Sequence, residues 1–208
     1  MTTLPRLRSF LLLTGIAWLT ACSVIPETEP VTVYQLPAPT TQRIDAPPAP
    51  ASLRINTPHA GIATSATRIL VNPEGEQISA YKGARWSDPA PALLREHLTR
   101  AFNRSGAVEQ VSSDDHSLHA DYHLMSDLRQ FRVTYVEGPP RVVIELDARL
   151  VDPSNRRMLA SRTFVIEQTL SATEVPSVVQ AFGDATGKLE SELIGWTRDQ
   201  LMQASPRQ

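Results

Sequence analysis

Apolar and polar residues alternate within residues 142–151, where one face is apolar and most of the other face is charged. A period of two is typical of a β-strand with one buried side. Residues 122–136 and 158–167 also have strand character, and a Gly-Pro-Pro turn and an Asp-Pro-Ser-Asn turn separate the three segments. We therefore expect a meander of three long strands. The apolar face of the middle strand consists of Val142, Ile144, Leu146, Ala148 and Leu150.

A different period governs the C-terminal part of the chain. Between Glu174 and Met202, apolar residues recur at helical spacing and form one stripe. Gly183 and Gly187 lie near this stripe, and we expect them to let the helix approach the sheet closely. The stripe itself consists of Val175, Val178, Val179, Phe182, Leu189, Leu193 and Trp196.

A second helix has clear start and stop signals. Asp88 is a candidate N-cap, and Pro89 suits the first helical position. Leucine, alanine and phenylalanine residues follow at helical spacing, and Gly106 is the expected stop.

Shorter strands surround this helix in the sequence. We expect strands at residues 53–55, 67–71, 77–81 and 108–111, the second and third of them joined as a hairpin. Two helices and several strands predict a mixed, largely antiparallel sheet with the helices packed on it, in the α/β or α+β class.

The first residues form an export signal followed by a cysteine. Residues 1–21 have a basic start, a short apolar run and a small-residue exit, which is typical of a signal peptide. Leu-Thr-Ala-Cys at residues 19–22 resembles the bacterial lipobox, in which the cysteine sulfur is diacylated and the chain is cut before it. We expect lipidation at Cys22; the alternative is an ordinary buried cysteine at the edge of an uncleaved helix.

A proline-rich segment follows, and we interpret residues 22–50 as the lipidated cysteine with a tether and residues 51–205 as the domain. Proline-rich segments favour an extended, semi-rigid geometry. One β-branched and aromatic island, residues 31–36, is predicted to be a short strand. If this strand docks onto the domain, the free tether shrinks to the residues between Cys22 and Pro30.

Charge and cysteine content narrow the function classes. Without residues 1–21 the chain has 18 basic groups (20 minus Arg6 and Arg8) against 22 acidic ones, a net charge of −4. No basic block stands out, which argues against nucleic acid as a partner. Cys22 is the only cysteine, so an intramolecular disulfide is excluded.

Candidate metal ligands gather at His116, His119 and His123, close to several aspartates. On a helix, His119 and His123 would share a face, as metal ligands do. The pattern instead predicts a loop that runs into a strand, where residues four apart lie roughly 13 Å apart. We therefore expect no metal site.

Catalytic motifs are missing from the sequence. There is no Gly-x-Ser-x-Gly elbow and no glycine-rich phosphate loop. The carboxylates Glu145 and Asp147 lie on the presumed outer face of a strand, where solvation explains them. We expect no enzymatic activity and no cofactor.

Two places are candidates for contact with a partner protein. Arg85 and Trp86 precede the second helix, and Trp and Arg are enriched at interface hot spots. The favoured alternative for Trp86 is packing as a lid on the core. Tyr135, with Pro139 and Pro140 at the tip of the long hairpin, is the other candidate.

The order of motifs resembles the ABC-type transport auxiliary lipoprotein family, which includes PqiC-like (YmbA-like) proteins. The resemblance covers nearly all of the chain after the signal, and its motifs are structural. They are the tyrosine-x-leucine segment at Tyr34–Pro37, Ala80–Pro89 with the helix that ends at Gly106, Leu128–Phe131, Val142–Leu150, Leu159–Phe164 and the closing helix with Trp196.

This resemblance implies a three-layer α/β fold and a non-enzymatic lipoprotein of a Gram-negative envelope transporter. Such proteins accompany an ABC ATPase, a permease and a mammalian-cell-entry (MCE) domain protein in lipid transport between membranes. Ser23 follows Cys22 where an aspartate would signal inner-membrane retention, so the periplasmic face of the outer membrane is the expected location. The resemblance implies docking of the MCE assembly there; a lipid-binding shuttle and an assembly lipoprotein of another envelope machine are the alternatives.

Overall fold

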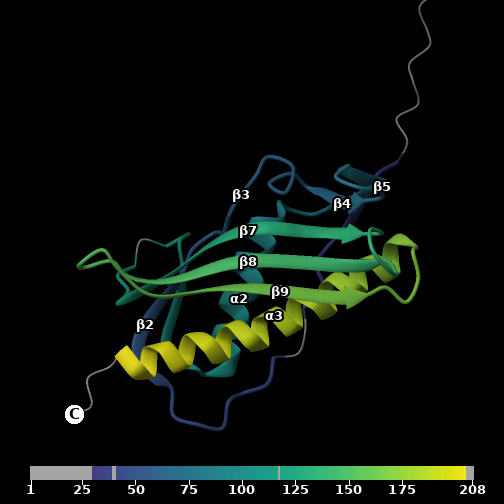
Figure 1. Cartoon of the computed structure of the whole chain (residues 1–208). Helices are drawn as coiled ribbons and strands as arrows, with labels where there is room; N and C mark the ends of the chain where they lie inside the picture. The colour runs from purple at the N-terminus through teal and green to yellow at the C-terminus, as the bar shows by residue number, and fades with distance from the viewer. Residues whose placement is uncertain (1–29, 39–40, 117, 205–208) are drawn as a thin grey trace, which may run out of the picture. The chain divides into compact units, whose positions relative to one another are not determined.

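Three long strands form one side of the sheet. The computed structural model describes residues 30–38, 41–116 and 118–204. Strands β7 (Tyr122–Thr134), β8 (Arg141–Asp152) and β9 (Arg157–Thr169) pair antiparallel in chain order (Figure 1). The predicted meander is therefore confirmed.

Three short strands lie end to end along the other edge of β7, all parallel to it. They are β2 (Ala49–Ile55), β3 (His59–Ala60) and β4 (Arg68–Asn72). β2 pairs with the start of β7 and β4 with its end. β2, β3 and β4 thus pair in turn with successive parts of β7.

The sheet branches outward from these short strands. β6 (Val108–Ser113) pairs parallel with β2 at one end of β7. At the other end, β5 (Ser79–Trp86) pairs antiparallel with β4, which confirms the predicted hairpin, and β1 (Thr32–Tyr34) pairs parallel with β5. The result is a nine-stranded mixed sheet whose long pairings are antiparallel.

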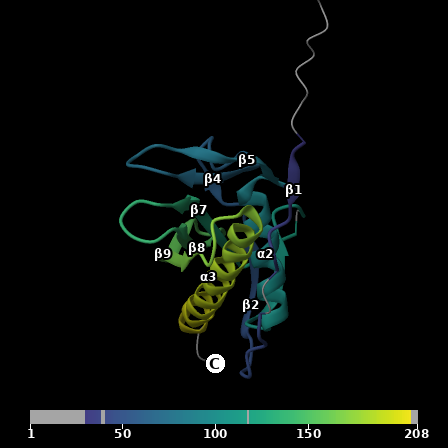
Figure 2. The same ribbon diagram turned by 90° about the vertical axis from the view of Figure 1, so that its right-hand side faces the viewer.

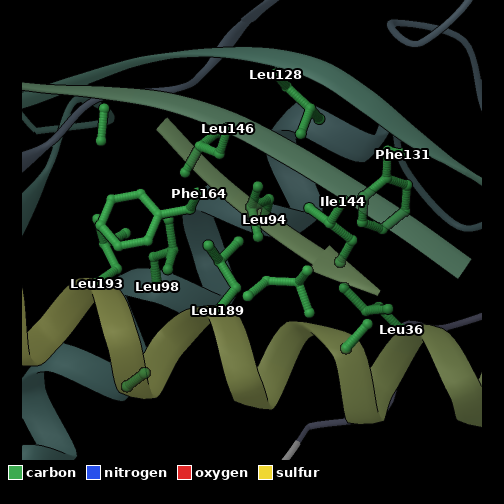
Figure 3. Close-up of a cluster of buried hydrophobic side chains, with 14 of the residues drawn as sticks. Leu36, Leu94, Leu98, Leu128, Phe131, Ile144, Leu146, Phe164, Leu189 and Leu193 are labelled. Carbon is green, nitrogen blue, oxygen red and sulfur yellow. The ribbon is translucent and has the colours of Figure 1, made fainter. Parts of the chain in front are cut away.

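Two helices pack on this sheet, α2 (Ala90–Ser105) and α3 (Val175–Ala204). Figure 3 shows leucines of both helices, Leu94 and Leu98 of α2 and Leu189 and Leu193 of α3, around the apolar side chains of the long strands. The apolar set predicted for β8 is at most 1% exposed. The predicted class, a mixed and largely antiparallel sheet with two main helices, is confirmed.

The N-terminal strap, which we define as residues 31–38 and 41–48, packs against the domain. The predicted strand within it docks as β1 on β5, and Leu36 is buried in the core with 5% exposure. The Ile44 N–H donates to the Ser105 carbonyl at 2.9 Å, and Arg198 donates to the Pro47 carbonyl at 3.1 Å. The compact unit therefore begins at Val31, and the described residues 31–38 and 41–50, expected to lie in the tether, belong to it.

Two details of the helices differ from expectation. α2 begins at Ala90 with Pro89 in the N-cap position and makes no side-chain capping hydrogen bond, so the expected cap by Asp88 is wrong. Gly183 of α3 faces Pro37 of the strap, where a Cβ atom would lie 2.8 Å from the Pro37 Cβ. This glycine therefore admits the N-terminal strap, whereas the sequence suggested close approach to the sheet.

Candidate functional site

Cys22 lies outside the described residues, so its lipidation stays a prediction. The first strand after it is β1, which begins at Thr32 and is paired with β5 along its length. Nine peptide units link Cys22 to Val31, and an extended chain of that length spans at most ~30 Å. Lipidation at Cys22 would thus hold the β1 end of the domain within that distance of the membrane.

Trp86 belongs to the core and does not form a contact surface. Its side chain is 1% exposed and meets Phe182 edge-on at 5.2 Å and Phe131 at 6.1 Å between ring centroids. The favoured alternative for this residue, packing on the core, is what the structure shows. Arg85 precedes it on β5 and points to the opposite, exposed face of the strand.

Tyr135 lies half-buried just after β7 and close to Tyr81 of β5. The two hydroxyl groups are 3.4 Å apart, and the Tyr135 N–H donates to the Asn72 carbonyl at 3.0 Å. Burial raises the pKa of Tyr81 far above its usual range, and the neighbouring Tyr135 adds to the rise. Tyr81 therefore stays protonated at neutral pH, and its hydroxyl group makes a polar contact with Tyr135, just after the end of β7.

Arg85 has an arginine neighbour that sequence reasoning missed. The backbone register places Arg68 of β4 directly opposite Arg85 of β5, and Val33 of β1 opposite Arg85 on the other side. All three side chains are exposed. No sequence signal links Arg68 to Arg85, because their proximity depends on the β4–β5 register.

The candidate metal ligands His116, His119 and His123 lie in the loop before β7 and on β7 itself. No group of three or more histidine, cysteine or acidic residues suited to a metal occurs among the described residues. His123 lies on β7, as expected for a strand. Burial lowers the pKa of His123, and the positive charge of Arg54 and the nearby His119 lower it further.

The aspartates beside these histidines hold loops in place. Asp114 accepts hydrogen bonds from the Thr57 N–H at 2.8 Å and from Arg95 at 3.3 Å. Burial acts to raise the pKa of Asp114, but the Thr57 and Arg95 contacts outweigh it and the pKa is lowered. Asp121 accepts bonds from the N–H and the hydroxyl of Ser52, and these lower its pKa.

A cavity of about 660 Å³ lies beneath the strap, next to α3. Its lining includes the charged residues Arg43, Lys188 and Glu190 together with Ile44 and Ile194, and apolar atoms make up the larger part of the exposed wall. Glu190 is 2% exposed and accepts a hydrogen bond of 3.0 Å from the Thr41 hydroxyl. A buried, hydrogen-bonded carboxylate is thus part of a wall that is otherwise mostly apolar.

The outer face of the long strands carries balanced charge. Arg129 contacts Asp147 at 2.8 Å, and Asp127 lies between Arg129 and Arg149 and contacts both. Glu145 accepts a hydrogen bond from Gln130. The expectation that Glu145 and Asp147 lie on an outer strand face is thus confirmed, and both are paired with neighbours on the sheet.

No helix in the described part of the chain is both long and apolar enough to cross a membrane. This finding covers α2 and α3, which are the helices that the structure describes.

Known proteins share this fold and sequence pattern. An uncharacterized protein of Bradyrhizobium diazoefficiens is 32% identical over 164 residues, which is 79% of this chain and 44% of that protein. A crystal structure of a Xanthomonas campestris protein of the DUF330 family superposes with a TM-score of 0.78 and 32% identity, over 84% of this chain and 98% of that one. A Chlamydia trachomatis protein, with 10% identity and a TM-score of 0.54 over 74% of this chain and 98% of that one, shares the fold alone.

The chain spans less than half the length of the Bradyrhizobium relative. A family model described as the ABC-type transport auxiliary lipoprotein component matches residues 34–193, from β1 to the middle of α3. The chain therefore belongs to the ABC-type transport auxiliary lipoprotein family.

Proposed function

We propose that this protein is a non-enzymatic lipoprotein, anchored through Cys22 in the periplasmic face of the outer membrane, that docks the MCE assembly of an ABC-type lipid transport system. The observation that carries the proposal is the family match over residues 34–193. The family description names an auxiliary component of an ABC-type transporter; the MCE protein, the outer membrane and the anchor are our additions.

The lipobox-like sequence and the docked strap support an anchored role. Each acyl CH₂ that enters a membrane contributes about 0.8 kcal/mol, so several chains on one cysteine hold a protein firmly. The strap starts nine residues after Cys22 and is fixed to the domain by β1 and Leu36. A domain held this way stays beside its membrane and presents its remaining surface to a partner.

Docking makes fewer demands on the cavity under the strap than lipid carriage does. A shuttle needs an apolar cavity for an acyl chain, because burying unpaired polar groups against hydrocarbon is costly. The wall of the cavity under the strap is mostly apolar, but Arg43, Lys188 and Glu190 place charged groups in it, and an acyl chain would have to lie against them. A docking protein needs only a complementary surface.

Co-purification with the MCE protein of the same operon tests the proposal. The lipidated wild-type chain in mild detergent is expected to retain the MCE protein, with an unrelated lipoprotein as the control for non-specific capture. Absence of any association would remove the docking role. If native mass spectrometry of the purified protein instead shows bound phospholipid, the shuttle replaces it, and a gene neighbourhood with a different envelope machine would favour the assembly role.

A further inference from the structure

A row of exposed side chains crosses β1, β5 and β4, the part of the sheet that contains the first described strand. Val33, Arg85 and Arg68 are directly opposite one another on β1, β5 and β4, so their side chains share one face. Val31 lies two residues before Val33 and on the same side of the chain. Val31 and Val33 are 51% and 49% exposed. We call these four residues the β1–β5 patch.

The two arginines of the patch have no counter-charge among the residues that the structure describes. Like charges directly opposite one another on paired strands are destabilising. Neither the Arg68 nor the Arg85 guanidinium has an ion pair or hydrogen bond with any other described residue. The acids Glu74 and Glu76 lie at the closed end of the β4–β5 hairpin, whereas Arg68 and Arg85 pair at its open end. The charge of the patch is therefore available to an anion from outside the domain.

The position of the patch in the chain indicates what that anion is. β1 is the first described element, and Figure 2 shows it beside β5 at the edge of the molecule. The patch begins at Val31, nine residues from Cys22, so an anchor at Cys22 keeps it within ~30 Å of the lipid surface. Guanidinium groups bind phosphate in a bidentate manner, and apolar side chains beside them favour a membrane interface.

We propose that the β1–β5 patch rests on the phospholipid surface that holds the acyl chains of Cys22, with Arg68 and Arg85 on lipid phosphates. This inference rests on the proposed anchoring at Cys22. It fixes the orientation of the domain: β1, β4 and β5 face the leaflet. The opposite end of the long strands, where the β8–β9 turn lies, faces the periplasm (Figure 1).

Fluorescence quenching on vesicles tests this orientation in the lipidated, full mature chain. A fluorophore is attached at Gln35→Cys, an exposed position just after β1, or at Met158→Cys, an exposed position at the start of β9. Acylation blocks the Cys22 sulfur, so each variant carries one reactive thiol. The vesicles contain phosphatidylethanolamine, phosphatidylglycerol and a lipid with a nitroxide on its headgroup.

The position-35 label is expected to be quenched several-fold more strongly than the position-158 label. The double variant Arg68→Glu/Arg85→Glu should remove most of that difference. Its matched control, Arg156→Glu/Arg157→Glu at the exposed β8–β9 turn, changes the net charge equally and should preserve the difference.

Equal quenching at both positions in a protein that floats with the vesicles would overturn the patch and leave the anchor intact. Failure to float would overturn the anchor and the patch together. A position-35 label that is shielded only after the MCE protein is added would assign the patch to a protein partner and also overturn the proposal.

Discussion

Gly183 and Pro37 meet where α3 passes the N-terminal strap. A Cβ atom at Gly183 would lie 2.8 Å from the Pro37 Cβ and 3.1 Å from its Cγ. Gly195, twelve residues further along the same helix, has no atom within 4 Å of its would-be Cβ. The two glycines share a helix and differ in what lies beside them.

We expect Gly183→Ala to lower the free energy of unfolding and Gly195→Ala to leave it unchanged or raise it. An alanine contributes up to about 1 kcal/mol more than glycine to helix stability. At position 183 this gain is offset by overpacking against the strap, which costs roughly 1–3 kcal/mol. Urea denaturation of both variants measures the difference, and equal effects would show that the strap does not press on α3.

Asp121 is expected to make the free energy of unfolding depend on pH in the acid range. Its carboxylate accepts bonds from the Ser52 hydroxyl at 2.7 Å and the Ser52 N–H at 2.8 Å, and these lower its pKa in the folded state. A depressed carboxyl pKa contributes stability above the unfolded value of about 3.9 and loses it as pH falls through the folded value.

The stability difference between pH 7 and pH 3 should therefore be smaller for Asp121→Asn than for the wild type. Chemical denaturation at the two pH values measures this change. Asp45, an exposed carboxylate in the strap, serves as the control position, and Asp45→Asn should keep the wild-type difference. An unchanged difference in Asp121→Asn would mean that its bonds to Ser52 are not formed in solution.

At the scale of elements, the strap is part of the folded unit. Leu36 is 5% exposed within the core, whereas Val33, on the adjoining strand, is 49% exposed. Truncation of a buried leucine typically costs about 2–5 kcal/mol, while exposed positions usually change stability by less than about 0.5 kcal/mol.

We expect Leu36→Ala to lower the free energy of unfolding of the whole domain by about 2–5 kcal/mol and Val33→Ala to have little effect. Thermal and urea unfolding monitored by circular dichroism measure the two changes. If Leu36→Ala unfolds like the wild type, the strap is a detachable tether.

Much of this element structure was predictable because local patterns determine it. The alternation in β8 and the apolar stripe of α3 follow from burial of one face, and Gly106 ends α2 with a positive φ of 65°. The strand at residues 32–34 was predicted as an island in a proline-rich stretch. Its partner was not, because a three-residue strand carries no information on which sheet edge it joins.

The features that could not be predicted from the sequence are contacts between residues that lie far apart in it. The two-residue strand β3 is too short to have a period, and its place on β7 depends on β2 and β4 around it. Arg68 and Arg85 are seventeen positions apart and meet only through the irregular β4–β5 register. For Trp86 the sequence favoured packing on the core over a partner contact, and the structure places the side chain in the core.

At the scale of the whole molecule, the family and the fold agree. The family match runs from the strap into α3, and the Xanthomonas campestris structure covers 84% of this chain. Every element of the sheet and both helices lie within or next to that match. The chain from Val31 onward thus forms one compact unit, and the proposed lipid attachment at Cys22 lies nine residues before it in the sequence.

Metabolic labelling with radioactive palmitate, followed by membrane fractionation, tests that attachment most directly. We expect the wild-type chain to incorporate label and to sediment with the outer membrane, and Cys22→Ser to lose both the label and the membrane association. A wild type without label, or a Cys22→Ser protein that stays in the membrane pellet, would contradict lipid anchoring at this residue.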